Sequence, residues 1–338
     1  MTRSASLTAV RRGNPPSAAD RAAALTPRRR LQLALAGLWV LDGLLKLQPF
    51  MFTKSFAPMT LGDAADGAPK WLASPINWAS GLDQHHPVGL MLLFAVIELL
   101  IGFGIALPAT LKPALVSCVL WVPFLWFFAE GLGGLASGSP NAFTGAPGAS
   151  ILYLLTAVLL WPSGREAASE AARFIGSRSS KAVWIALWGL LAFCAFLPVN
   201  RSADAFSGAI SGNGQGAPVW YASLLEHASS FTAGRGGELG IVFGVALALV
   251  AVSVLAPWRR VVRAGMVLAF VLAALIWVFG EGFGMPFMGM GTDPDTGPLL
   301  ALLAFVYWPV RRLAIAPAAA GVAAGTAMGT ATAEGAAA

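Results

Sequence analysis

The stretch VGLMLLFAVIELLIGFGIAL at residues 88–107 decides the fold class. It is apolar along its whole length, and its one ionisable side chain is that of Glu98. An apolar run of about 20 residues forms a helix long enough to cross the roughly 30 Å hydrocarbon core of a membrane. We therefore expect this stretch to be a membrane-spanning helix.

Seven other apolar runs have the same character. Together they predict eight spans at 31–49, 88–107, 113–129, 148–162, 182–199, 239–257, 262–280 and 297–314. The chain is 57% hydrophobic and 11% charged, whereas soluble domains carry about 25% charged residues. The composition therefore predicts an all-α integral membrane protein with the lipid bilayer as its surroundings.

The basic residues predict the orientation of these spans. Eight spans with the N-terminus inside place seventeen Lys and Arg side chains on the cytoplasmic side and four on the outer side. Positive charge collects in cytoplasmic loops, so both termini are expected in the cytoplasm. Abundant Ala, Gly and Arg are typical of a GC-rich bacterial genome, which indicates a plasma membrane. Because the basic residues lie in short clusters between spans, the net charge of +6 does not indicate nucleic-acid binding.

The two halves of the sequence match each other at an offset of roughly 150 residues. GAPKWLAS at 67–74 matches GAPVWYAS at 216–223, and WFFAEGLG at 126–133 matches WVFGEGFG at 277–284. Four helices return the chain to its starting side, so two such units are parallel repeats. The expected organisation is a disordered basic arm, a first unit, a cytoplasmic linker, a degenerate second unit and a disordered tail, at 1–30, 31–162, 163–181, 182–314 and 315–338.

Charged side chains inside the predicted spans mark the candidate site. Asp42 and Lys46 lie one helical turn apart, so they share a face and can neutralise each other. Glu98 lies near the centre of its span, where a charge costs about 2.5–3.5 kcal/mol. It is either a protonated carboxyl bonded to another helix or a group that handles a proton or a ligand. The second half has Leu249 opposite Glu98, so we expect the working site in the first unit.

Two weaker features lie at the outer ends of the predicted units. Glu130 and Glu281 each precede glycines, and we expect them to accept hydrogen bonds from the irregular segments that follow, with a ligand site as the alternative. Met285, Met288 and Met290 carry thioethers of the type that binds Cu(I), and methionine is also ordinary apolar filler. The sequence has no nucleotide-binding, zinc-protease or haem-attachment motif, and it identifies no catalytic residue.

The segments LDGLLK at 41–46 and ELLIGFGIAL at 98–107 resemble the DoxX/DoxD family of four-helix membrane proteins. The matching positions are Gly43, Lys46, Glu98, Gly102 and Gly104. The likeness extends to the second unit only through the internal repeat, because that unit lacks both the Lys and the Glu. It implies a redox-associated membrane subunit that interacts with quinone and with a redox partner protein, and it leaves the oligomeric state open.

Two other functions stay open on the sequence alone. A proton-coupled small-molecule permease would use the intramembrane carboxylates, with its site at the interface of the repeats. A ligand-free membrane scaffold would use the same polar residues only for helix packing.

Overall fold

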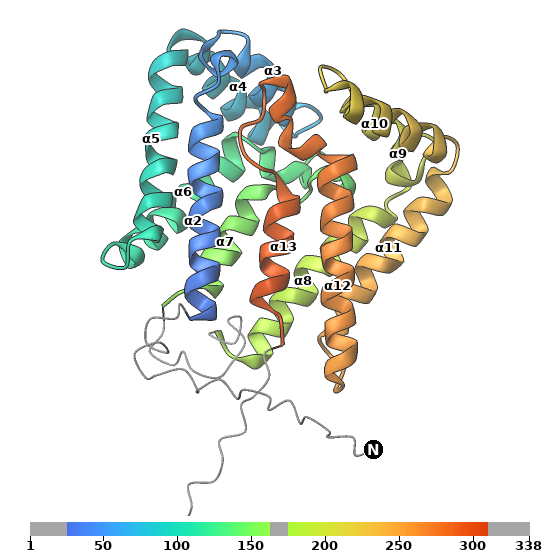
Figure 1. Cartoon of the computed structure of the whole chain (residues 1–338). Coiled ribbons are helices and arrows are strands. Elements are labelled where there is room, and N and C mark those ends of the chain that lie inside the picture. Colours follow the sequence, from blue (N-terminus) through green and yellow to red (C-terminus); the bar gives the residue numbers. More distant parts are fainter. Residues whose placement is uncertain (1–25, 163–174, 310–338) are drawn as a thin grey trace, which may run out of the picture.

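The computed structural model describes residues 26–162 and 175–309 (Figure 1). Over these two ranges the regular structure is helical, and no β-strand is present. The predicted tail at 315–338 lies outside the described residues, as do most of the predicted arm and most of the predicted linker.

Five of the described helices are long and apolar enough to cross a membrane, and they correspond to five of the predicted spans. They are α5 (Pro87–Ala106), α6 (Leu111–Phe128), α8 (Ser177–Phe196), α11 (Gly236–Ser253) and α12 (Arg259–Leu275), which continues as a π-helical turn to Gly280. Large apolar side chains such as Leu100, Leu120 and Val242 are 65–72% exposed on their outward faces. An apolar surface of this kind is suited to contact with lipid.

The other three predicted spans form helices of a different kind. The helix α2 (Pro27–Leu45) carries three arginines and one aspartate. The helices α7 (Ala149–Leu159) and α13 (Thr296–Val306) have 11 residues each, and at 1.5 Å per residue each is about 16 Å long. The helices within the predicted spans 148–162 and 297–314 are therefore shorter than a full span, and the number of eight spans stays a prediction. The residues directly before each of these helices form short 3-10 turns and irregular backbone, so fewer residues remain for the helix itself.

The short helices α7 and α13 lie next to each other inside the bundle (Figure 1). One apolar core joins them to α2, α5, α6, α8, α11 and α12. A helix that is apolar on all sides is stable where protein surrounds it. Irregular backbone beside such helices is tolerated because it is buried in protein and not in lipid.

Four more helices lie at one end of the bundle, which we call the loop end (Figure 1). They are α3 (Phe56–Ala65), α4 (Lys70–His85), α9 (Ala205–Gly212) and α10 (Val219–Thr232). Each half of the chain therefore has one long helix, two loop-end helices, two more long helices and one short central helix, in the same order.

The first helix begins inside the predicted basic arm. Thr26 accepts a hydrogen bond from the Arg29 backbone nitrogen at 3.2 Å, and Pro27 occupies the first turn, where its fixed backbone angle favours a helix. Arg28 donates to the Leu159 carbonyl oxygen at 3.0 Å, at the end of α7. Arg29 likewise reaches the last carbonyl groups of α5. These arginines therefore satisfy the unpaired carbonyls at two helix ends, and residues 27–30 are helical, not disordered.

Candidate functional site

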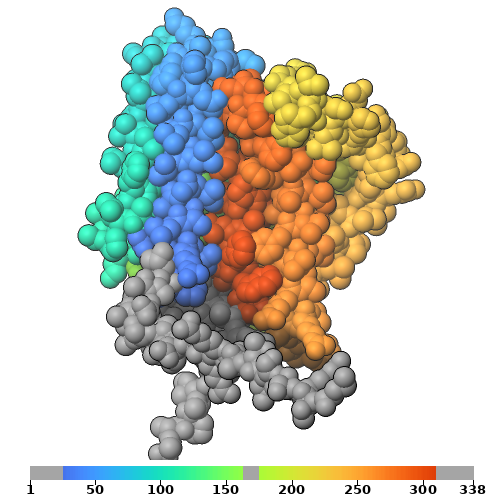
Figure 2. Space-filling model, in the orientation of Figure 1, coloured from blue at the N-terminus to red at the C-terminus, as the bar shows by residue number. Residues whose placement is uncertain are grey.

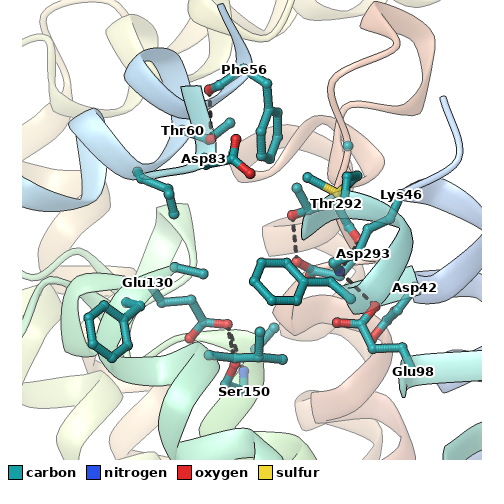
Figure 3. Close-up of a pocket in the computed structure, with 18 of the residues that line it drawn as sticks. Asp42, Lys46, Phe56, Thr60, Asp83, Glu98, Glu130, Ser150, Thr292 and Asp293 are labelled. Carbon is teal, nitrogen blue, oxygen red and sulfur yellow. Dashed lines mark hydrogen bonds and ion pairs between the residues drawn. The ribbon is translucent and has the colours of Figure 1, made fainter. Parts of the chain in front are cut away.

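A cavity of about 540 Å³ lies at the loop end of the first half (Figure 3). Its walls come from α2 to α7 and from residues 284–295 of the second half. Small-molecule sites have volumes of about 300–1,000 Å³. Phe94, Phe124 and Phe128 form an aromatic wall, with ring centroids 6.0 Å apart for the first two and 4.9 Å for the last two.

A buried ion pair lies in the cavity wall. The Nζ atom of Lys46 is 2.8 Å from Oε2 of Glu98, and it also donates to the carbonyl oxygen of Thr292 at 3.0 Å. Lys46 is 7% exposed and Glu98 is fully buried. An ammonium group has three N–H donors. Two of them are used by these contacts, and the third has no acceptor among the described residues, so it can donate to a ligand.

Close packing of α2 on α5 brings this pair together. A Cβ atom at Gly43 would lie 2.6 Å from the Leu99 side chain, and one at Gly102 would lie 2.9 Å from the Val40 backbone nitrogen. Small residues at a helix contact allow the backbones to approach. Two of the three glycines of the family-like motif thus set the distance between the charged residues, whereas Gly104 faces α6.

Asp42 shares a helix face with Lys46 but has another partner. Its Oδ1 atom accepts a hydrogen bond from the Tyr153 hydroxyl of α7 at 2.8 Å, and the residue is buried. The ammonium of Lys46 pairs with Glu98 instead of Asp42. Sequence analysis missed Tyr153. A tyrosine inside an apolar span is a usable signal, because a buried phenol hydroxyl needs a partner.

Residues 284–295 of the second half close the cavity over the first half. Besides the contact of Lys46 with Thr292, Nε2 of Gln48 donates to the carbonyl oxygen of Gly291 at 2.9 Å. Figure 2 shows the orange C-terminal segment directly against the blue surface of the first helices. The site therefore belongs to both halves, and not to the first half alone as the sequence indicated.

Two aspartates of this closing segment lie in the cavity wall. The carboxylate of Asp293 accepts hydrogen bonds from the Thr292 hydroxyl at 2.9 Å and from the Asp295 backbone nitrogen at 2.8 Å. Sequence analysis assigned neither aspartate a role in the site.

Glu130 and Glu281 have the same structural role in the two halves. Oε1 of Glu130 accepts hydrogen bonds from the backbone nitrogen and the hydroxyl of Ser150, both at 2.8 Å. Glu281 accepts from the backbone nitrogens of Thr296 at 3.1 Å and Gly297 at 3.0 Å, and from the Thr296 hydroxyl. Each carboxylate caps the start of a short central helix, where free N–H groups favour negative charge. These N–H groups belong to helix starts and not to the irregular segments named in the prediction.

The turn after each glutamate has the same backbone form. The φ angles are +53° at Gly131 and +60° at Leu132, and they are +59° at Gly282 and +61° at Phe283. This left-handed region is uncommon for residues with a side chain. The matched segments EGLG and EGFG therefore specify one tight turn in each half.

Asp83, near the end of α4, is a cavity residue that sequence analysis missed. Its side chain is 3% exposed, and neither carboxylate oxygen has a hydrogen-bond partner among the described residues. Burial raises its pKa to about 6. The surrounding segment SGLDQHH is polar and resembles an ordinary helix end, so it carries no signal that this aspartate is buried.

The candidate Cu(I) ligands do not share one wall. Met285 and Met290 line the cavity, whereas Met288 lies beside Gly216, in the segment between α9 and α10. The methionines therefore contribute apolar surface at two separate contacts.

No family model matches the chain, and neither does any curated protein or solved structure. Over the described residues, fold and site define a class: an all-helical protein with several helices of membrane-spanning length and a largely apolar cavity that holds a buried ion pair at one end of the bundle. Its function therefore has to follow from the chemistry of that cavity.

Proposed function

We propose that the chain is an eight-span membrane protein of the DoxX/DoxD type, with two parallel units and both termini in the cytoplasm of a bacterial plasma membrane. The distribution of basic residues supports this orientation. The shared order of elements and the equivalent caps of Glu130 and Glu281 support the duplication. In this arrangement each short central helix crosses the membrane together with the irregular segment before it.

We propose further that the cavity binds a quinone head group, as in a redox-associated membrane subunit. The observation that carries this proposal is a buried ion pair inside a cavity whose rim is apolar and exposed. Met59, Trp78 and Leu82 line the cavity and are 40–67% exposed. An exposed apolar rim of this kind suits the entry of an apolar, lipid-soluble ligand.

The cavity wall offers partners for each part of a quinone head. The third N–H of Lys46 donates to one carbonyl oxygen, while Glu98 neutralises the ammonium. The rings of Phe94, Phe124 and Phe128 flank the flat quinone ring. Electrons for such a couple come from a redox partner protein in this proposal, because the sequence has no haem-attachment or nucleotide-binding motif.

A proton-coupled permease is the second candidate, and the carboxylates around the cavity favour it. A permease needs a path to the other end of the membrane. Between the cavity and that end, α7, α13 and the surrounding helices form an apolar core that a path would have to open. This packing favours ligand binding over conduction.

The test is to identify what the purified protein carries. Protein is extracted gently from its own membranes, and bound lipid-soluble molecules are identified by native mass spectrometry. We compare wild type with the double variant Lys46→Met/Glu98→Gln, which removes both charges together. Glu281→Gln is the matched control, because it alters a buried carboxylate that caps a helix in the second half.

We expect quinone on wild type and on the control, and its loss from the double variant. A wild-type chain without quinone, or equal quinone on the double variant, would contradict the proposal.

A further inference from the structure

Asp83 differs from the other carboxylates of the cavity wall. Within residues 26–162 and 175–309 it is the one cavity carboxylate that is less than 9% exposed and has neither a hydrogen bond nor an ion pair. Asp42, Glu98, Glu130 and Asp293 all have partners in the protein. Buried polar groups are nearly always hydrogen-bonded, so an unpaired buried carboxylate in the wall of a cavity points to a donor on the ligand.

Asp83 also lies at a different part of the cavity from the ion pair. Figure 3 shows it across the open space from Lys46, Glu98 and Asp42. It comes from α4 at the loop end, whereas Asp42 and Glu98 come from α2 and α5 in the bundle and Lys46 directly follows α2. A flat ligand between these two groups would present opposite edges to them.

We propose that Asp83 accepts a hydrogen bond from the second oxygen of a hydroquinone, so that the cavity prefers the reduced head group to the quinone at neutral pH. This inference rests on the proposed quinone function and adds the oxidation state that the site selects.

The chemistry follows from donors and acceptors. A hydroquinone carries an O–H donor at each of two opposite ring positions, whereas a quinone carries only carbonyl acceptors there. An ionised carboxylate accepts hydrogen bonds and cannot donate them. Lys46 can donate to an oxygen of either form. Asp83 therefore distinguishes the two forms, because an oxidised head leaves its carboxylate unpaired.

The preference should depend on pH. Burial places the pKa of Asp83 at about 6, so its carboxylate is mostly ionised at pH 7.5 and mostly protonated at pH 5. The protonated acid can donate to a quinone carbonyl, which removes the discrimination. The other titratable groups of the cavity wall and of the end of α4 are Asp42, Lys46, Asp63, Glu98, Glu130, Tyr153, Asp293, Asp295, His85 and His86.

The experiment measures binding of decylubiquinol and decylubiquinone to the full chain in nanodiscs, under anaerobic conditions. The dimethyl ether of the hydroquinone serves as a probe that keeps the ring but has no O–H donor. Asp83→Asn replaces the carboxylate by an amide of the same shape that both donates and accepts. Asp63→Asn is the matched control, because Asp63 lines the same cavity but is exposed to solvent.

For wild type at pH 7.5 we expect the hydroquinone to bind about tenfold more tightly than either the quinone or the dimethyl ether, as for one hydrogen bond to a charged group. The ratio should fall towards one at pH 5. It should be close to one at both pH values in Asp83→Asn and unchanged in Asp63→Asn. Binding of the quinone itself shows that Asp83→Asn is folded. Asp83→Leu provides a second check, because it should bind hydroquinone and quinone equally tightly.

The outcomes separate this inference from the proposed function. A hydroquinone preference that persists in Asp83→Asn, or no preference in wild type, overturns the role of Asp83 while quinone binding stands. If neither probe binds to wild type, the proposed function and this inference both fall.

Discussion

The ion pair between Lys46 and Glu98 predicts strongly non-additive effects on stability. Removing one partner of a buried pair costs about 3–5 kcal/mol, because the other charge is left without compensation. Glu98→Gln should lower the free energy of unfolding by about 3 kcal/mol, at the lower end of that range. The Lys46 ammonium still donates to the Thr292 carbonyl oxygen at 3.0 Å in this variant and so keeps one partner. Lys46→Met should lie near the upper end, since the Glu98 carboxylate then loses its ion-pair partner and, among the described residues, keeps only the nearby Trp121 indole.

The double variant Lys46→Met/Glu98→Gln removes both charges and should cost only about 0–2 kcal/mol, because replacing a whole buried pair is often close to neutral. The free energy of unfolding is measured in mixed micelles by tryptophan fluorescence as denaturing detergent is added. Glu238→Gln is the control, because this carboxylate is exposed in the first turn of α11. If the double variant lost the sum of the two single losses, the two side chains would not interact and the geometry of the cavity would be refuted.

Three other predictions concern the helix caps, one close glycine contact and the effect of Asp83 on stability. Glu130→Gln and Glu281→Gln should each lower the free energy of unfolding by about 1 kcal/mol, the typical value of a helix cap, measured in the same micelles. Gly280→Ala should cost about 3 kcal/mol or more, because its Cβ atom would lie 1.7 Å from a carbonyl oxygen of the first half, while Gly189→Ala, with open space around it, should be tolerated. Folding raises the pKa of Asp83 to about 6 and so favours its protonated form. The free energy of unfolding of wild type should therefore fall relative to that of Asp83→Asn, by at most about 3 kcal/mol, as the pH rises from about 4 to about 6; melting curves of the two proteins measure this difference.

The long helices and the site residues Asp42, Lys46 and Glu98 could be predicted because the signals for them lie within short stretches of the sequence. Helical periodicity puts Asp42 and Lys46 on one face, and an isolated Glu98 in an apolar run needs a partner. The sequence does not state which pairs form. That choice depends on Gly43 and Gly102, whose close contacts place α5 beside Lys46.

The rest of the site could not be predicted because it depends on contacts between distant segments. Thr292 lies 246 positions from Lys46 in the chain, and no local pattern records that contact. Asp83 is buried by the packing of other helices over the polar end of α4. The short lengths of α7 and α13 were missed for a related reason, since hydropathy measures apolar content and not where a helix begins.

The asymmetry between the two halves has a physical cause. A capping carboxylate stabilises the start of a helix in each half, so Glu130 and Glu281 are both useful wherever the central helices are short. A buried ion pair is destabilising unless it has partners or a ligand, so a second copy would need a second ligand site. The closing segment of the second half supplies a backbone carbonyl to Lys46 of the first. The second half thus contributes to the single site without carrying charges of its own at the positions opposite Lys46 and Glu98.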